Sequence, residues 1–250
     1  MLPELILREE KEGKLAYVML LGLLSGLTGF GLAKLFFPGM ADILSVVFAS
    51  IPLVYPLTSV FLNDEKNGRP HTPEIEFYGS LFLGQVISFL VLGLMFFQDF
   101  EMQIGVFSDQ MSSLGLAGNA VLPDIFFVVL ANNVVLYLSI FAVAAIIGSA
   151  GAFILTWNAS VLGLFLASLL SELRGLKEVI LGSAQTPSPV AYVPHATFEM
   201  AGFIVAGIAG SLISAAVYRE HFDLDTWKDL TKLFATGLVF ILLGAVLESA

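Results

Sequence analysis

Residues 125–170 read IFFVVLANNVVLYLSIFAVAAIIGSAGAFILTWNASVLGLFLASLL, and none of them carries a charge. A transmembrane helix needs about 20 mostly apolar residues, so a run of this length holds two crossings joined by a turn. The small residues 148–151, Gly-Ser-Ala-Gly, interrupt the run near its middle and supply that turn. The sequence therefore predicts two adjacent membrane-spanning helices, at 125–147 and 151–173.

The composition of the whole chain is also that of a membrane protein. It is 57% hydrophobic and 13% charged, whereas soluble domains are about 45–50% apolar and about 25% charged. The net charge is −10 and no basic stripe is present, so a nucleic-acid partner is not expected. The absence of cysteine excludes a disulfide, a thiolate metal site and a cysteine nucleophile.

Five further stretches are long and apolar enough to cross a bilayer. They are Leu15–Phe37, Ala41–Leu62, Tyr78–Phe97, Pro194–Tyr218 and Leu230–Leu247. We therefore predict an all-α fold, a polytopic transmembrane bundle of about seven spans, six at the fewest, that forms one membrane domain over 1–250. The first three spans occupy 15–97, and the bilayer of the cell membrane is the expected surrounding.

Two segments lie outside these spans. Residues 1–14 are mixed and acidic rather than a signal peptide, and they predict a short amphipathic helix at the membrane interface. Residues 98–124 are apolar but interrupted by Gly and Ser, so they either lie in the interface or dip into the membrane as a re-entrant element.

Lys and Arg are more frequent in cytoplasmic loops, and this bias sets the orientation. A cytoplasmic N-terminus puts most of the 11 cations inside, with Arg174 and Lys177 as the main exceptions. The C-terminus is then outside, and Trp227 anchors the last span at the inner interface.

Polar residues inside spans are candidate functional residues, because they cost free energy in hydrocarbon. Asn132 and Asn133 form an adjacent amide pair whose side chains diverge by about 100° around the helix. Asn158 lies in the next span. Each of these amides either makes interhelical hydrogen bonds or contacts a pore or substrate.

The start of the sixth span combines a polar head with small residues. His195, Glu199, Gly202, Ala206 and Gly210 share one helical face by their spacing. The small residues predict close packing against another helix. Glu199 either accepts hydrogen bonds from neighbours such as Asn132 or Asn133, or belongs to an ion or proton site.

Neither a metal site nor an enzyme is expected. Zinc needs at least three protein ligands, and the other two histidines, His71 and His221, fall in loops on the opposite side from His195. The chain has no Gly-x-Ser-x-Gly elbow and no Walker loop. We therefore predict no cofactor and no catalytic residue.

Small residues also recur in the first half. Gly22 with Gly26, and Ser80 with Gly84, lie one helical turn apart. Such pairs predict either close packing of helices within the chain or self-association.

The second half of the chain, 125–249, resembles the stage II sporulation protein M family of membrane proteins. The resemblance rests on Ala131-Asn132-Asn133, the 148–151 turn, Asn158 with 160–163, Pro194-His195-Ala196-Thr197-Phe198-Glu199, 206–210, and Gly244-Ala245-Val246-Leu247-Glu248. The chain departs from the family at Ala196, where glycine is frequent. The resemblance implies a four-span helical membrane region at 125–249 and candidate residues Asn132, Asn133, Asn158, His195 and Glu199.

The family is named for a membrane component of a cell-wall hydrolase assembly. This resemblance, the absence of catalytic motifs and the small-residue faces together favour a non-enzymatic scaffold with a membrane-protein partner. We also expect a homo-oligomer. The alternative is an oligomeric channel or transporter that uses the polar residues near Glu199. A membrane-embedded hydrolase is a third hypothesis.

Overall fold

The computed structural model describes residues 11–66, 72–105, 122–148, 150–179, 193–218 and 224–248. Within these ranges the long elements are α2 (Lys11–Phe36), α3 (Ala41–Lys66), α4 (Thr72–Phe96), α6 (Leu122–Ile147), α7 (Ala150–Val179), α8 (Val193–Tyr218) and α9 (Leu224–Glu248). Short 3-10 turns, η1 (Pro38–Met40) and η2 (Phe97–Asp99), follow α2 and α4. The predicted all-α fold is confirmed.

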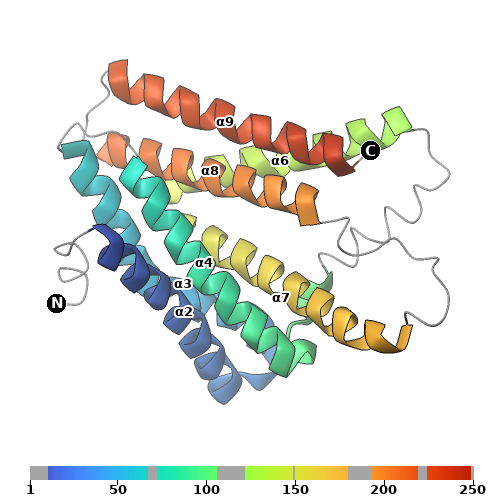
Figure 1. Ribbon diagram of the computed structural model, residues 1–250. Coiled ribbons are helices and arrows are strands. Elements are labelled where there is room, and N and C mark those ends of the chain that lie inside the picture. The colour runs from blue at the N-terminus through green and yellow to red at the C-terminus, as the bar shows by residue number, and fades with distance from the viewer. Residues whose placement is uncertain are drawn as a thin grey trace.

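Seven of these helices are long and apolar enough to cross a membrane, which confirms the predicted number of spans. Successive spans run in opposite directions, so α2 begins and α9 ends at opposite ends of the bundle (Figure 1). This alternation agrees with an odd number of crossings. The protein is therefore a multi-pass membrane protein.

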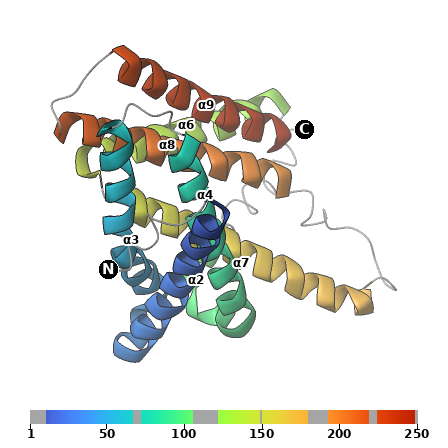
Figure 2. The same ribbon diagram turned by 60° about the vertical axis from the view of Figure 1, so that its left-hand side comes forward.

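The helices form two groups, which Figures 1 and 2 show from two directions. In the first group α2 packs on α3 and α4, and α4 packs on α7; in the second, α8 lies between α6 and α9. The long helix α7 belongs to the first group and also touches α8, so it links the two groups. A buried apolar cluster that includes Leu81, Leu155 and Leu212 joins the two groups.

Glycine allows the closest helix contacts in the first group. A Cβ on Gly84 of α4 would lie 2.9 Å from the backbone nitrogen of Leu23 in α2, and a Cβ on Gly22 would lie 3.2 Å from the nitrogen of Gln85. The two backbones thus touch with no side chain between them. Of the two alternatives for Gly22 and Gly26, the structure places both at packing contacts within the chain, with Gly26 against the Ser88 side chain.

The turn between α6 and α7 is also a glycine feature. Gly148 has a φ of 35°, a left-handed conformation that favours glycine. The nitrogen of Gly151 donates to the Gly148 carbonyl oxygen at 3.3 Å, and the Ser211 hydroxyl of α8 donates to the same oxygen at 3.0 Å. The turn predicted at 148–151 is present and is held by α8.

Several predicted boundaries differ from the structure. Residues 11–14 belong to α2 rather than to a separate interfacial helix, and residues 1–10 lie outside the described ranges. α3 continues through Pro52 and Pro56 to Lys66. Of the 98–124 segment, residues 106–121 are not described, while residues 98–105 fold back onto the first helix group, where Phe100 is buried beside Phe30.

Candidate functional site

A carboxyl group and an amide meet inside the second helix group. The Asn133 amide nitrogen of α6 donates to Glu199 Oε1 of α8 at 2.6 Å. Both residues are 3% exposed. This is one of the two arrangements expected for Glu199, with Asn133 as the donor. The bond joins α6 to α8 through two residues that are 66 positions apart in sequence.

Small residues give this pair its close packing. A Cβ on Gly244 of α9 would lie 2.6 Å from Glu199 Cγ, so α9 covers the carboxyl side chain closely. One turn further along α8, a Cβ on Gly202 would lie 2.7 Å from Ile241 Cδ1 of α9. Ala206 is fully buried, and Gly210 faces α6 beside Ala144. The predicted small-residue face of α8 is therefore its contact surface with its own neighbours, α6 and α9.

A second hydrogen bond joins α6 directly to α9. The Tyr137 hydroxyl donates to the Phe234 carbonyl oxygen at 2.8 Å, and a Cβ on Gly237 would lie 2.6 Å from the Tyr137 ring. Tyr137 is one turn beyond Asn133, so the same face of α6 makes both contacts. Buried Phe203 and Ile241 complete the apolar surroundings.

The two adjacent asparagines are separated by the fold. Asn133 is buried at Glu199, whereas Asn132 is exposed on the outward surface of α6. Successive residues point about 100° apart on a helix, so only one of them can face the bundle. The structure does not bring Asn132 into the site.

Asn158 also lies elsewhere. It is 6% exposed, and its amide donates to the Ile154 carbonyl oxygen of its own helix at 2.9 Å. This bond pairs the amide with the backbone of its own helix. Asn158 is not grouped with Asn133 and Glu199.

His195 stands in the first turn of α8, before the apolar span that begins at Thr197. Its side chain is partly buried, and desolvation by burial lowers the pKa of His195 from its usual value of 6.5. The neutral imidazole is therefore favoured. Its carbonyl oxygen also lies near Gly244, 3.4 Å from where a Cβ would stand, so α9 packs on this first turn as well.

A polar cluster in the first helix group was not singled out from the sequence. The Gln85 amide nitrogen of α4 donates to Thr156 Oγ1 of α7 at 2.8 Å and reaches Ser25 Oγ of α2 at 3.4 Å. Gln85, Ser88 and Thr156 are fully buried. Among the described residues, Gln85 Oε1 and Ser88 Oγ have no hydrogen-bond partner. The rule that selected Asn158, a polar group inside a predicted span, also selects Gln85.

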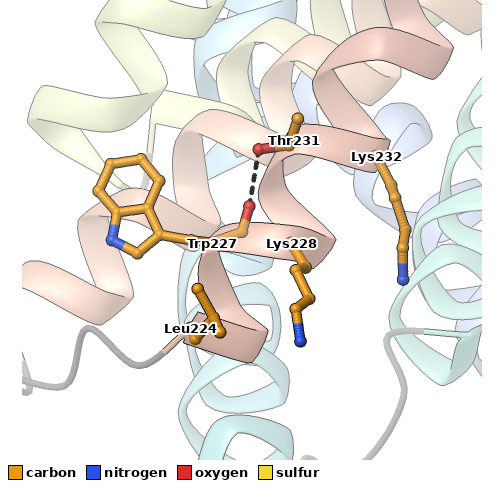
Figure 3. A pocket seen from close by; sticks show the side chains of 5 residues that line it. All are labelled: Leu224, Trp227, Lys228, Thr231 and Lys232. Carbon is orange, nitrogen blue, oxygen red and sulfur yellow. Dashed lines mark hydrogen bonds between the residues drawn. The ribbon is translucent and has the colours of Figure 1, made fainter.

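The ends of the bundle carry further polar contacts. At the end where α2 finishes, Lys34 Nζ contacts Asp99 Oδ1 at 2.6 Å, and the Gln103 amide donates to the Asp42 carbonyl oxygen at 3.0 Å. At the opposite end, the first turns of α9 present an open hollow of about 440 Å³ lined by Leu224, Trp227, Lys228, Thr231 and Lys232 (Figure 3). Exposed Trp and Lys at a span's start are typical of a membrane–water interface.

The chemistry open to these residues is limited. Asn133 and Glu199 supply one donor–acceptor pair between helices, and among the described residues no three His, Asp or Glu side chains come together as metal ligands. A buried carboxyl group held by an amide either locks helices together or exchanges a proton or cation. The site is therefore that of a helical membrane protein with a paired carboxyl group in its interior.

Comparison with known proteins identifies this kind of membrane protein more closely. The sequence profile described as stage II sporulation protein M matches residues 79–250. The chain belongs to this family. The match begins at residue 79 in α4, earlier than the 125 boundary that the residue pattern suggested, and it includes Gln85 as well as Asn133, His195 and Glu199. No curated protein and no solved structure matches the chain.

Proposed function

We propose that this protein is a non-enzymatic membrane scaffold or assembly component that works as a homo-oligomer in the cell membrane, with its N-terminus in the cytoplasm. The main structural support for the scaffold is the environment of Glu199. The carboxyl group is 3% exposed, it accepts a hydrogen bond from Asn133, and α9 packs on it at Gly244. A polar pair in such a close contact joins helices and defines their relative position.

Family membership supports the same proposal, because the match covers α6 and α8, which carry this pair, and α9, which packs on it. The cytoplasmic N-terminus is supported by the charge bias of the loops. Trp227 and Lys228 at the start of α9 fit a membrane interface at the same end of the bundle as the start of α2 (Figures 1 and 3).

A second candidate function is a channel or transporter, and the Gln85 cluster is the observation that favours it. Gln85 Oε1 and Ser88 Oγ are buried acceptors without a donor among the described residues. Most buried polar groups in proteins are paired with protein or with water. A cation or a chain of water molecules along α4 and α7 would supply the missing contacts.

Flux through proteoliposomes separates the two functions. The unaltered protein, Glu199→Gln and Gln85→Leu are reconstituted in parallel, and proton, monovalent and divalent cation gradients are applied. The scaffold proposal expects the same leak as protein-free liposomes for all three. Flux that disappears in Glu199→Gln or Gln85→Leu, with insertion unchanged, would overturn the scaffold proposal in favour of transport.

Partner capture tests the scaffold directly. After crosslinking in the native membrane and extraction in mild detergent, we expect a defined membrane protein to be recovered with the chain. Substitutions that are meant to disrupt partner binding must lie on exposed faces. Gly202 and Ala206 lie inside the fold, and their replacement would disturb α8 itself. A chain recovered alone from its own membrane would contradict the proposal.

A further inference from the structure

We propose that the exposed face of α6 is a homodimer interface, in which α6 packs in parallel against α6 of a second copy and Asn132 meets its counterpart. This inference deepens the proposed scaffold function, because it names the first partner and the surface that binds it. It begins with the poor coverage of α6. Among the seven described spans α6 is the least enclosed, with 17% of its apolar window buried.

The uncovered face of α6 has the pattern of a helix-pairing surface. Val128 is 70% exposed, Val135 is 64% exposed and Ile146 is 80% exposed. Exposed Asn132, Ser139 and Ala142 fall between them, so that the six positions alternate in steps of four and three residues. This is a heptad seam with Asn132, Ser139 and Ile146 at one core position and Val128, Val135 and Ala142 at the other.

Asn132 is the residue that requires a partner on this face. It lies six residues beyond Phe126, where the apolar window of α6 begins. At 1.5 Å per residue this is about 9 Å along the span. Hydrocarbon offers no hydrogen-bond partner to an amide, and Asn132 points about 100° away from Asn133 and so cannot share Glu199.

A second copy of this chain fits that requirement. Two copies inserted in the same orientation bring α6 against α6 in parallel around a two-fold axis along the membrane normal, where a residue meets its own counterpart. A primary amide both donates and accepts, so two Asn132 side chains satisfy each other. The small side chains of Ser139 and Ala142 permit a close approach, and one asparagine in a heptad core fixes the register of the pair.

Single cysteines test the interface, because the natural chain has no cysteine. The variants Val128→Cys and Val135→Cys are each oxidised in native membranes, and we expect both to give disulfide-linked dimers. A disulfide forms only where the Cα atoms of the two cysteines lie within about 4.4–6.8 Å, so crosslinking reports close contact of the two α6 helices. Val239→Cys on α9 is the matched control, because Val239 is a span valine that is 52% exposed. Crosslinking at Val239 as strong as at Val135, or none at either α6 position, would overturn the proposal.

Replacing Asn132 measures what the amide contributes. We expect Asn132→Val to weaken dimerisation in lipid about tenfold and Asn132→Gln to retain much of it, as measured by dilution in bicelles or liposomes. Equal dimerisation by all three proteins would overturn the role of the amide. Failure of this interface is distinguishable from failure of the scaffold function. Crosslinked dimers that conduct ions would refute the scaffold alone. Capture of a different protein without α6 crosslinks would refute only this interface.

Discussion

The two helix groups use buried amides in different ways. In the first group, Gln85 donates to the hydroxyl groups of Thr156 and Ser25, which are already bonded to their own helices. Thr156 donates to the Ala152 carbonyl oxygen and Ser25 donates to the Gly22 carbonyl oxygen, each at 2.8 Å. In the second group, Asn133 donates to the carboxyl group of Glu199 on another helix. Polar groups that are satisfied within a helix make few demands on their neighbours, whereas Glu199 depends on correct packing of α6, α8 and α9. The second group should therefore be the more sensitive to polar substitution.

Asn133→Leu is expected to have the largest effect. It leaves the buried Glu199 without this donor, and we expect a loss of about 3 kcal/mol in the free energy of unfolding. Asn132→Leu is the matched control one residue away on the exposed face, and it should change the monomer by less than about 0.5 kcal/mol. Unfolding of monomer in detergent, followed by tryptophan fluorescence, compares them. Equal losses would contradict the structural difference between the two asparagines.

Gly84→Ala should come next and tests the first group. Its methyl group would stand 2.9 Å from the backbone nitrogen of Leu23, and overpacking of this kind costs about 2 kcal/mol. A Cβ added to Gly31 of α2 would have nothing within 4 Å, so Gly31→Ala should stabilise the helix by about 0.5 kcal/mol. Thermal unfolding of the two variants in the same detergent gives the comparison. A tolerated Gly84→Ala would mean that α2 and α4 are not in backbone contact.

Gln85→Leu should cost less than Asn133→Leu. It removes an acceptor that has no donor among the described residues, and the Thr156 hydroxyl keeps its bond to the Ala152 carbonyl oxygen. We expect a change of no more than about 1 kcal/mol in the free energy of unfolding. Denaturant titration beside Asn133→Leu checks the order. A loss as large as that of Asn133→Leu would show that the two groups depend equally on their amides.

The smallest expected effect concerns pH. Because burial lowers the pKa of His195 from 6.5, the unfolded chain binds a proton to this residue at a higher pH than the folded chain does. Stability is therefore lost as pH falls below about 6.5 and levels off below the folded-state pKa. His195→Asn should remove this part of the pH dependence. Between pH 7.5 and pH 5, the free energy of unfolding should therefore fall more for the unaltered protein than for the variant. An equal fall in the two proteins would contradict this prediction.

Most of the secondary structure was predictable from the sequence. The spans predicted at Leu15–Phe37 and Gly151–Leu173 became Leu15–Phe36 and Gly151–Ser171, because length and apolarity alone decide what a bilayer accepts. The parts of the helices that extend beyond the apolar spans were harder to predict. Residues 63–66 and 72–76 belong to α3 and α4, because a helix continues into water beyond its apolar part.

Within the candidate site, the common face of Glu199, Gly202, Ala206 and Gly210 was also readable from the sequence, because helical periodicity fixes which residues of one helix lie together. The partners of that face were not. Gly244, Tyr137 and Gln85 contact residues on other helices, and no local pattern states which helices become neighbours.

The sequence by itself determined a membrane protein with seven apolar helices, the polar residues within them and the family resemblance, because these follow from composition, spacing and order along the chain. The tertiary structure decided that Asn133 faces Glu199 while Asn132 faces outward, and that the small-residue face of α8 packs inside the chain. The physical reason is rotation: an apolar helix is accepted by the bilayer at any angle about its own axis, and only packing against its neighbours selects one.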